Sequence, residues 1–211
     1  MGIYLPDAFR VENRQTLLAH ATAHPFATVI TDGPGGLLVS HLPLLVDGRR
    51  EVLRGHLARA NPQAAAFGAG CDALAIFHGP HAYVSPSVYE EHPSVPTWNY
   101  VVVHARGPAR LVDEASLRKT LDDLVLHFDA TGWRMEAPEE YLRSALDAIA
   151  GFEIAIQQLE GKWKLSQNRS LTDQQRVAAW LESGDADSRA VAALMRARLS
   201  EEARLPIHNE P

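Results

Sequence analysis

The segment with the clearest chemical potential reads Gly55-His-Leu-Ala-Arg-Ala-Asn-Pro62. Its alternation predicts a strand that ends here, and Asn61 followed by Pro62 is typical of a helix start. The N–H groups of a helix start attract a phosphate, and Arg59 could add a bidentate clamp. The alternative is that Asn61 only caps the helix and Arg59 is a surface cation. The spacing alone leaves both interpretations open.

A second polar feature is Ser40-His-Leu-Pro43, which interrupts an otherwise apolar strand. Polar groups in such a strand must find hydrogen-bond partners. The partner could be a ligand edge, or else a backbone group or the packing of a core histidine.

A third feature is Trp98-Asn-Tyr100, which follows a long loop and enters a strand. Two aromatic rings with an amide between them could form the wall of a pocket for a planar ring. Core packing explains the same residues equally well.

Cations and side-chain donors gather in Gly161-Lys-Trp-Lys-Leu-Ser-Gln-Asn-Arg169. This segment could bind an anion, a nucleic-acid backbone or a partner subunit, or it could be a solvated strand end. Further on, a helical tail carries Arg189, Arg196 and Arg198, which permits a weak helix-turn-helix interpretation. Acidic neighbours weaken it: Asp185, Asp187, Glu201 and Glu202.

The ten histidines do not indicate a metal site. His20 and His24 have helical spacing but no glutamate between them to act as a general base. The other candidates have no accompanying carboxylate or cysteine pattern: His78, His81, His92 and His104. The sequence also lacks the Gly-x-Ser-x-Gly motif of a nucleophilic serine, so we expect neither a metal centre nor nucleophilic catalysis.

The composition is that of an ordinary globular protein. The chain has 211 residues, of which 46% are hydrophobic and 22% charged, with a net charge of −6. The acidic balance does not favour a broad nucleic-acid surface. The single cysteine, Cys71, rules out an intrachain disulfide and a thiolate zinc site. We therefore expect a reducing, cytoplasmic location, without a signal peptide or a membrane span.

The elements that position these residues alternate between short strands and helices. Strands connected by short turns favour antiparallel pairing, so we predict a mainly β fold of the α+β type, with a barrel core and peripheral helices. The helices are expected at 11–23, 62–67, 114–128, 138–149, 177–181 and 186–199, with Thr172 and Gln175 as a capping box. The strands are expected at 26–31, 37–46, 51–57, 73–77, 82–85 and 152–156, with a turn at 78–81. Residues 98–104 and 107–112 are expected to form one long strand or a bulged pair.

Several of these segments together resemble one family, the FMN-binding negative transcriptional regulators of the PaiB type. The resemblance covers residues 1–199 and rests on long blocks, chief among them Ser40-His-Leu-Pro-Leu-Leu45, Gly55 to Pro62, Ile76-Phe-His-Gly-Pro-His-Ala-Tyr83, Val95 to Tyr100 and Glu160 to Arg169. Shorter blocks at 26–28 and 85–87 agree with it.

This resemblance implies an antiparallel split β-barrel related to flavin reductases and pyridoxamine-phosphate oxidases. We expect that barrel at 1–170 and a helical extension at 171–211. It also implies a homodimer that holds FMN in a groove between subunits. By analogy the cofactor residues are Thr28, Ser40, His41, Leu42, His56, Arg59, Asn61, Trp98, Asn99, Tyr100, and, from the partner subunit, Lys164 and Gln167.

The family name implies repression of genes, directly on DNA or through another protein. An alternative is a flavin-dependent reductase or oxidase, possible also in a haem-related form, with His41, His81 and Tyr83 as candidate proton donors. A third is an interaction protein with an empty pocket. The resemblance alone does not choose between these functions.

Overall fold

The computed structural model describes residues 2–134 and 136–202 of the chain. In this part the helices are α1 (Arg14–Ala23), α2 (Pro62–Ala69), α3 (Glu114–Phe128), α4 (Glu139–Asp147), α5 (Leu171–Leu181) and α6 (Ala186–Glu202). The strands are β1 (Arg10–Val11), β2 (Phe26–Gly33), β3 (Gly36–Pro43), β4 (Leu45–Asp47), β5 (Val52–Ala58), β6 (Cys71–Val84), β7 (Thr97–Leu111), β8 (Ile149–Ala155) and β9 (Gln158–Lys164).

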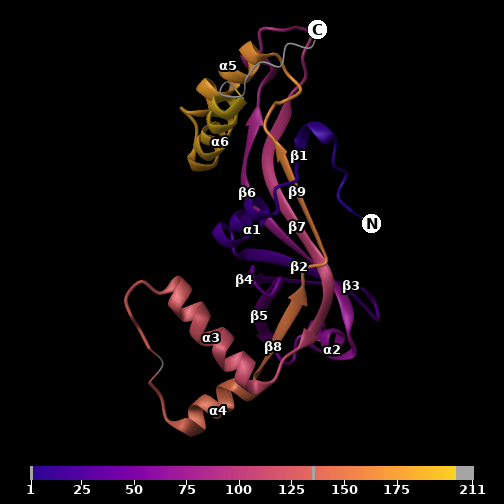
Figure 1. Cartoon of the computed structure of the whole chain (residues 1–211), viewed down its shortest axis with the longest axis vertical. Coiled ribbons are helices and arrows are strands. Elements are labelled where there is room, and N and C mark those ends of the chain that lie inside the picture. The colour runs from indigo at the N-terminus through magenta and orange to yellow at the C-terminus, as the bar shows by residue number, and fades with distance from the viewer. Residues whose placement is uncertain (1, 135, 203–211) are drawn as a thin grey trace. The chain divides into compact units, whose positions relative to one another are not determined.

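The strands follow the order β3-β2-β6-β7-β8-β5-β4, and β9 pairs with both β1 and β7 (Figure 1). The paired strands run antiparallel, as the short connections predict. The described strands do not close into a ring, because β3 and β4 end the order without pairing with each other. The predicted split barrel with peripheral helices is confirmed.

The contacts divide the chain into two compact units. Unit 1 comprises residues 1–11, 79–102 and 161–211, and unit 2 comprises 12–78 and 103–160. The long strands β6 and β7 contribute residues to both. This division does not test the expected boundary at residue 170, which stays a prediction.

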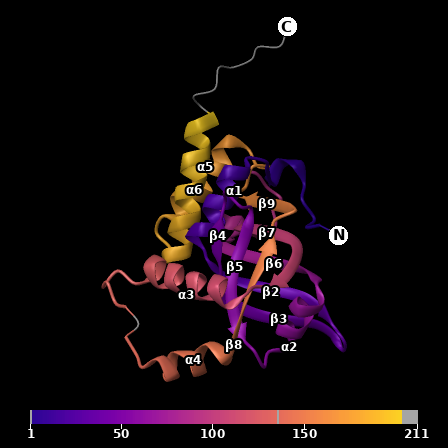
Figure 2. The same cartoon turned by 60° about the horizontal axis from the view of Figure 1, so that its bottom comes forward.

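Unit 2 holds most of the sheet. The β2–β3 hairpin pairs Phe26 with Pro43 at one end and Gly33 with Gly36 at the turn. Figure 2 shows α3 and α4 on one side of the strands β5 and β8. The core includes the fully buried rings of Phe67 and Phe152, whose centroids lie 4.7 Å apart.

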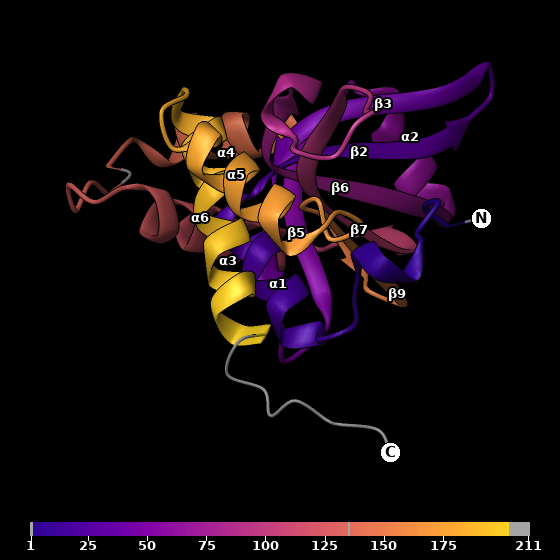
Figure 3. The same ribbon diagram turned by 90° about the horizontal axis from the view of Figure 1, so that it is seen from above.

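Unit 1 has a core of its own between helices α5 and α6 and the ends of β6 and β7. The two helices lie side by side (Figure 3). Their apolar faces are buried with residues from both strands: Ala82, Val84, Val101, Val177, Leu181, Val191 and Met195. Ser170 caps α5 by accepting a hydrogen bond from the N–H of Asp173. The predicted capping box of Thr172 and Gln175 is therefore wrong, because the helix begins two residues earlier.

The clearest difference from the predicted elements lies in β6. The dipeptide Gly79-Pro80 suggested a turn between two strands, but residues 71–84 form one continuous strand. Its buried positions are 73, 75 and 77 and then 80, 82 and 84, so the alternation shifts by one residue at His78-Gly79 while the strand continues. Proline holds an extended φ, so a strand tolerates it where its missing N–H is not needed for pairing.

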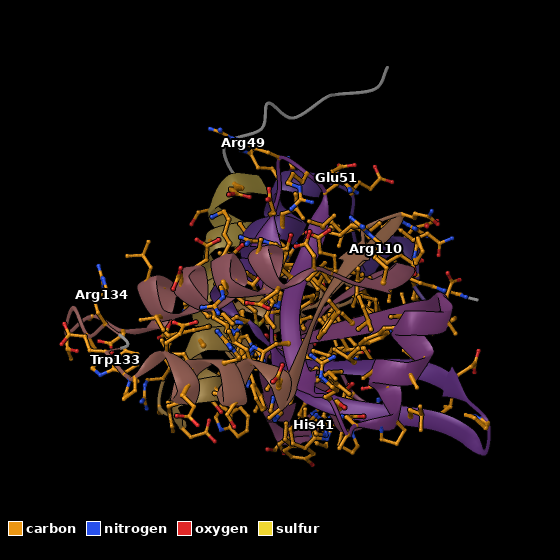
Figure 4. The ribbon with its side chains drawn as sticks, turned by 90° about the horizontal axis from the view of Figure 1, so that it is seen from below. His41, Arg49, Glu51, Arg110, Trp133 and Arg134 are labelled. Atoms are coloured by element: carbon orange, nitrogen blue, oxygen red, sulfur yellow. The ribbon has the colours of Figure 1, made fainter. Side chains whose placement is uncertain are left out.

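A buried carboxylate connects two strands of unit 2 and the turn before β5. Glu153 on β8 is only 5% exposed. Arg50, in the turn before β5, donates to both of its oxygens at 2.8 and 3.2 Å, and Arg110 on β7 donates at 2.9 Å. Arg110 is labelled in Figure 4. Because each arginine is exposed while the glutamate is not, the cations reach inward to neutralise a charge that burial would otherwise destabilise.

No helix among residues 2–134 and 136–202 combines the length and the apolar character that crossing a membrane requires.

A close backbone approach fixes how β7 and β8 meet. A Cβ atom on Gly107 would lie 1.9 Å from the carbonyl oxygen of Ala155. That distance is far inside van der Waals contact, and the obstacle is backbone rather than a flexible side chain. The pairing of the two strands therefore requires glycine at position 107.

We predict that Gly107→Ala lowers the free energy of unfolding by about 3 kcal/mol or more, since the two strands must separate to admit the methyl group. Gly35→Ala is the matched control, because a Cβ there meets nothing within 4 Å; its effect should stay below about 1 kcal/mol. Urea denaturation measures both. Equal effects of the two variants would refute the close approach.

Candidate functional site

Two of the expected cofactor residues face each other on the β2–β3 hairpin. Thr28 and His41 are register partners, and the threonine Oγ1 lies 3.2 Å from the histidine Nδ1. His41 is exposed and lies at the margin of unit 2 in Figure 4. Leu42 follows in the same strand, opposite Ala27, and is half-buried. The hairpin therefore pairs a hydroxyl with an imidazole on one face, while Leu42, the next residue, points to the other face.

A second pair connects β3 to the start of α2. The amide Nδ2 of Asn61 donates to Ser40 Oγ at 2.9 Å, and its Oδ1 accepts from the N–H of Gln63 at 2.9 Å. Asn61 is thus the N-cap of α2, as predicted, and Pro62 occupies the first turn. Gln63 is fully buried and donates to the carbonyls of Val29 and Leu38. This network fixes the helix start against the hairpin.

Arg59 lies just before that helix start, but its side chain reaches the end of α4. Its Nε donates to the carbonyl of Asp147 at 2.7 Å and its Nη2 to the carbonyl of Ile149 at 2.6 Å. The backbone N–H of Arg59 also donates to Ala148 at 2.8 Å. A cation is favourable at the negative end of a helix. Arg59 therefore caps α4, a contact that its sequence context did not suggest.

His56 lies on β5, three residues before Arg59 in the segment expected to bind the phosphate. Its ring lines a cavity of about 720 Å³ whose other walls come from α3, α4 and the loop between them. Burial lowers the pKa of His56 below its usual value. The ring is therefore neutral at pH 7.

In unit 1 the three residues of the expected ring wall do not share one face. Trp98 is 52% exposed, whereas Asn99 is fully buried and donates to Ser166 Oγ at 2.9 Å. Tyr100 is half-buried, with the ammonium of Lys162 5.5 Å from its ring centroid. Because successive strand residues point to opposite faces, Asn99 holds the core while Trp98 and Tyr100 share the other face.

The two expected residues of the partner subunit also form contacts inside unit 1. Lys164 donates to Thr97 Oγ1 and, at 2.6 Å, to the carbonyl of Trp98. Burial, with the nearby cations Lys162 and Arg169, lowers the pKa of Lys164. Gln167 closes its own turn: its Oε1 accepts from the N–H of Leu165 and its Nε2 donates to the carbonyl of Trp163.

An exposed aromatic cluster lies around Trp98. The rings of His81 and Tyr83 stand 5.9 and 6.0 Å from it, centroid to centroid, and His81 Nδ1 lies 3.5 Å from Asp187 Oδ2. From the sequence, His81 and Tyr83 were predicted only as candidate proton donors, because His81 was expected in a turn and Tyr83 in the strand that follows it. The alternation of the continuous strand β6 is the signal that would have grouped them.

The remaining expectations concern DNA and metals. The cations of α6 are engaged within unit 1: Arg196 pairs with Glu182 at 2.8 Å, and Arg189 donates to the carbonyl of Gly184. This gives no support to a DNA-reading helix. No group of three or more metal-binding side chains comes together among the described residues.

The open antiparallel barrel and this set of donors define a flavin-binding split-barrel protein. The family model described as "Putative FMN-binding domain" matches residues 3–158, and the chain belongs to this family. FMN is accordingly its cofactor.

Two further comparisons agree. The chain is 33% identical to the protease synthase and sporulation protein PAI 2 of Bacillus subtilis, over 95% of this chain and 100% of that protein. Among solved structures it resembles the FAD and heme binding protein of Mycobacterium smegmatis, with a TM-score of 0.62, 18% identity and 78% of each chain covered. It also resembles the flavocytochrome Anf3 of Azotobacter vinelandii, with a TM-score of 0.61 and 18% identity, covering 74% of this chain and 69% of that one. At this identity the two structures show the shared fold.

The corner of unit 2 around α2 suits the polar half of FMN. An exposed guanidinium precedes a helix N-terminus, which carries partial positive charge. Hydroxyl and imidazole groups lie on the hairpin at Thr28, Ser40 and His41, and the amide of Asn61 lies at the start of α2. These are the donors and acceptors that a phosphate and a polyhydroxyl chain require, so the residues present fit the cofactor.

The hydrogen bond between Asn61 and Ser40 is testable by itself. We predict that Asn61→Ala lowers the free energy of unfolding by about 1–3 kcal/mol, since it removes both a helix cap and a side-chain partner. Ser40→Ala should cost about 1 kcal/mol, and the double variant should cost less than the sum. Urea denaturation of all three measures this coupling. Asn168→Ala, at an exposed position, is the control, and strict additivity would contradict the contact.

Proposed function

We propose that this protein is an FMN-binding negative regulator of transcription that acts as a cytoplasmic homodimer. The observation that carries the proposal is the identity of 33% to the sporulation protein of Bacillus subtilis over the full length of that protein. Similarity that includes both the barrel and the helices after residue 170 supports a shared role more strongly than a shared fold does. Bound FMN supplies a ring that can accept and return electrons, which would let the protein respond to redox state.

In this proposal the FMN phosphate meets Arg59 and the start of α2. Thr28, Ser40, His41 and Leu42 line the ribityl chain and the ring edge. Support comes from the exposure of Arg59 and from the side-chain pairs at Thr28 and at Ser40. The guanidinium of Arg59 would then bind two partners, the phosphate anion and the partially negative carbonyl end of α4.

The flavin ring would lie at the interface of the homodimer, against Trp98 and Tyr100. Both are aromatic, and Trp98 exposes half of its surface. Lys164 and Gln167 would approach the ring from the partner subunit. In this arrangement Asn99 acts by holding its strand through Ser166 rather than by touching the ring.

Arg59→Ala should weaken FMN binding by about 10- to 100-fold, the loss of one charge-assisted contact worth about 1.5–3 kcal/mol. Quenching of flavin fluorescence on titration measures the affinity. Arg49→Ala is the matched control, because Arg49 is an equally exposed arginine in the turn before β5 (Figure 4).

Arg59→Lys separates the two roles of this side chain. Lysine keeps the charge for a phosphate but cannot donate to the carbonyls of Asp147 and Ile149 in fork geometry. Affinity retained in Arg59→Lys and lost in Arg59→Ala supports the phosphate role. Equal loss in both, together with a lower melting temperature, would assign Arg59 to α4 alone.

Regulation by direct DNA binding is the second testable part. We expect selection from random duplexes to enrich a sequence whose binding weakens steeply with salt, because phosphate contacts release counterions. Absence of enrichment at low salt would contradict direct binding. Repression would then pass through another protein, in agreement with the acidic net charge and the engaged arginines of α6.

An oxidoreductase is the second candidate function. The specific observation in its favour is the exposed cluster of His81, Tyr83 and Trp98, which offers a titratable group beside aromatic rings. The two similar structures are named for flavin and haem or cytochrome chemistry, which suits such a role. Turnover of NADH or NADPH by the FMN-loaded protein, lost in His81→Phe, would favour it.

A further inference from the structure

A large cavity in unit 2 lies outside the hairpin and α2 corner proposed for FMN. It measures about 720 Å³ and is enclosed by α3, α4 and β5. Figure 4 shows Trp133 and Arg134, two of its lining residues, on the loop that joins α3 to α4. Volumes of about 300–1,000 Å³ are typical of small-molecule pockets. The space is therefore large enough for a ligand of ordinary size.

Apolar side chains form most of the wall. They come from both helices and the connecting loop: Leu121, Leu124, Val125, Leu126, Trp133, Leu142, Ala145 and Leu146. Leu124 and Leu146 are buried, whereas Leu126 is 70% and Trp133 46% exposed. Exposed apolar residues beside buried ones indicate an open apolar mouth leading to an apolar interior. Such a surface favours an apolar occupant.

The ionised groups on the wall are balanced. Asp123 accepts from Arg54 at 2.7 Å and from Lys119 at 2.9 Å, while Arg118 donates to Glu114 at 2.9 Å. The two other charged lining residues, Asp122 and Arg134, have opposite signs. Two lining arginines and two lining aspartates give no net charge. The wall therefore offers no excess charge to select an ionic ligand.

This balance separates the cavity from a flavin phosphate pocket. A phosphate monoester carries about −1.5 to −2 charges at neutral pH and needs cationic donors. The lining charges of the cavity sum to zero, and Arg59 is not among the lining residues. The cavity and the corner around α2 therefore suit ligands of different charge.

His56 gives the apolar wall a single uncharged polar group. Its ring is half-buried, and Nδ1 is buried without a hydrogen-bond partner in the described structure. A neutral imidazole carries one donor and one acceptor. Because Nδ1 itself has almost no accessible surface, a ligand in the cavity would meet the accessible part of the imidazole ring, which lines the wall.

We propose that this cavity binds an uncharged, largely apolar small molecule whose one polar group forms a hydrogen bond with the ring of His56. The proposal rests on the cavity and its charges; it assigns His56 to this cavity rather than to the FMN site and takes FMN to bind at the corner around α2. It gives α3 and α4, which the flavin assignment does not use, a ligand-binding role.

The test uses N-phenyl-1-naphthylamine, an uncharged aromatic amine, and equilibrium dialysis against the FMN-loaded full-length protein. We expect saturable binding of about one probe per chain. Ala145→Trp should weaken it at least tenfold, because the new ring occupies the cavity from an exposed helix position. Ser144→Trp is the matched control on the same helix and points outside the lining set, so its affinity should equal that of the wild type.

His56→Phe is the second variant. It keeps an aromatic ring in the cavity wall but removes the hydrogen-bonding nitrogens. It should weaken the probe by about 3- to 10-fold, the range for one hydrogen bond. This variant also keeps the test decisive if Ala145→Trp does not fold.

Four results would overturn the proposal. One is the absence of probe binding, and another is equal binding in Ala145→Trp and Ser144→Trp. Displacement of the probe by FMN would identify the cavity as the flavin's own pocket. Equal affinity for the anionic analogue 8-anilinonaphthalene-1-sulfonate would show that the cavity does not select uncharged ligands.

Discussion

The alternation of side chains along β7 is the constraint on which both units depend. In unit 1 it places Trp98 on an exposed face and buries Asn99 against Ser166. In unit 2 the same strand carries Gly107 against the backbone of β8 and turns Arg110 toward Glu153. Since the period of a strand is two, a shift of one residue would reverse every one of these placements. The aromatic face and the barrel pairing are therefore determined together.

Local patterns in the sequence predict the elements well where a cap and a hydrophobic stripe agree. The helix expected at 114–128 has the observed bounds, because Asp113 caps it and its leucines follow helical spacing. The prediction failed at Gly79-Pro80, where residue types typical of turns lie inside a long strand. Pairing with neighbouring strands outweighs local preference there, and a pattern read along one segment does not contain that information.

The sequence indicated the local role of single residues in the candidate site, but not which distant residues they contact. Asn61 was identifiable as a cap from its own neighbourhood, whereas its bond to Ser40 joins positions 21 residues apart. Arg59 was recognised as a cation near a helix start, yet its partners at Asp147 and Ile149 lie 88 and 90 residues away. Helical and strand periodicity carry no signal for such distances. Long-range hydrogen bonds therefore decided what each predicted residue touches.

His56 shows why charge and burial must be considered together with position. The sequence grouped it with Arg59 because both lie in one segment. In the structure, Arg59 is exposed beside the negative end of α4, and His56 lines an apolar cavity under α3. Arg59 faces solvent and carbonyl dipoles, whereas burial lowers the pKa of His56 and favours its neutral form. Two neighbours on one strand end thus face environments suited to opposite classes of ligand, an anion and an uncharged apolar molecule.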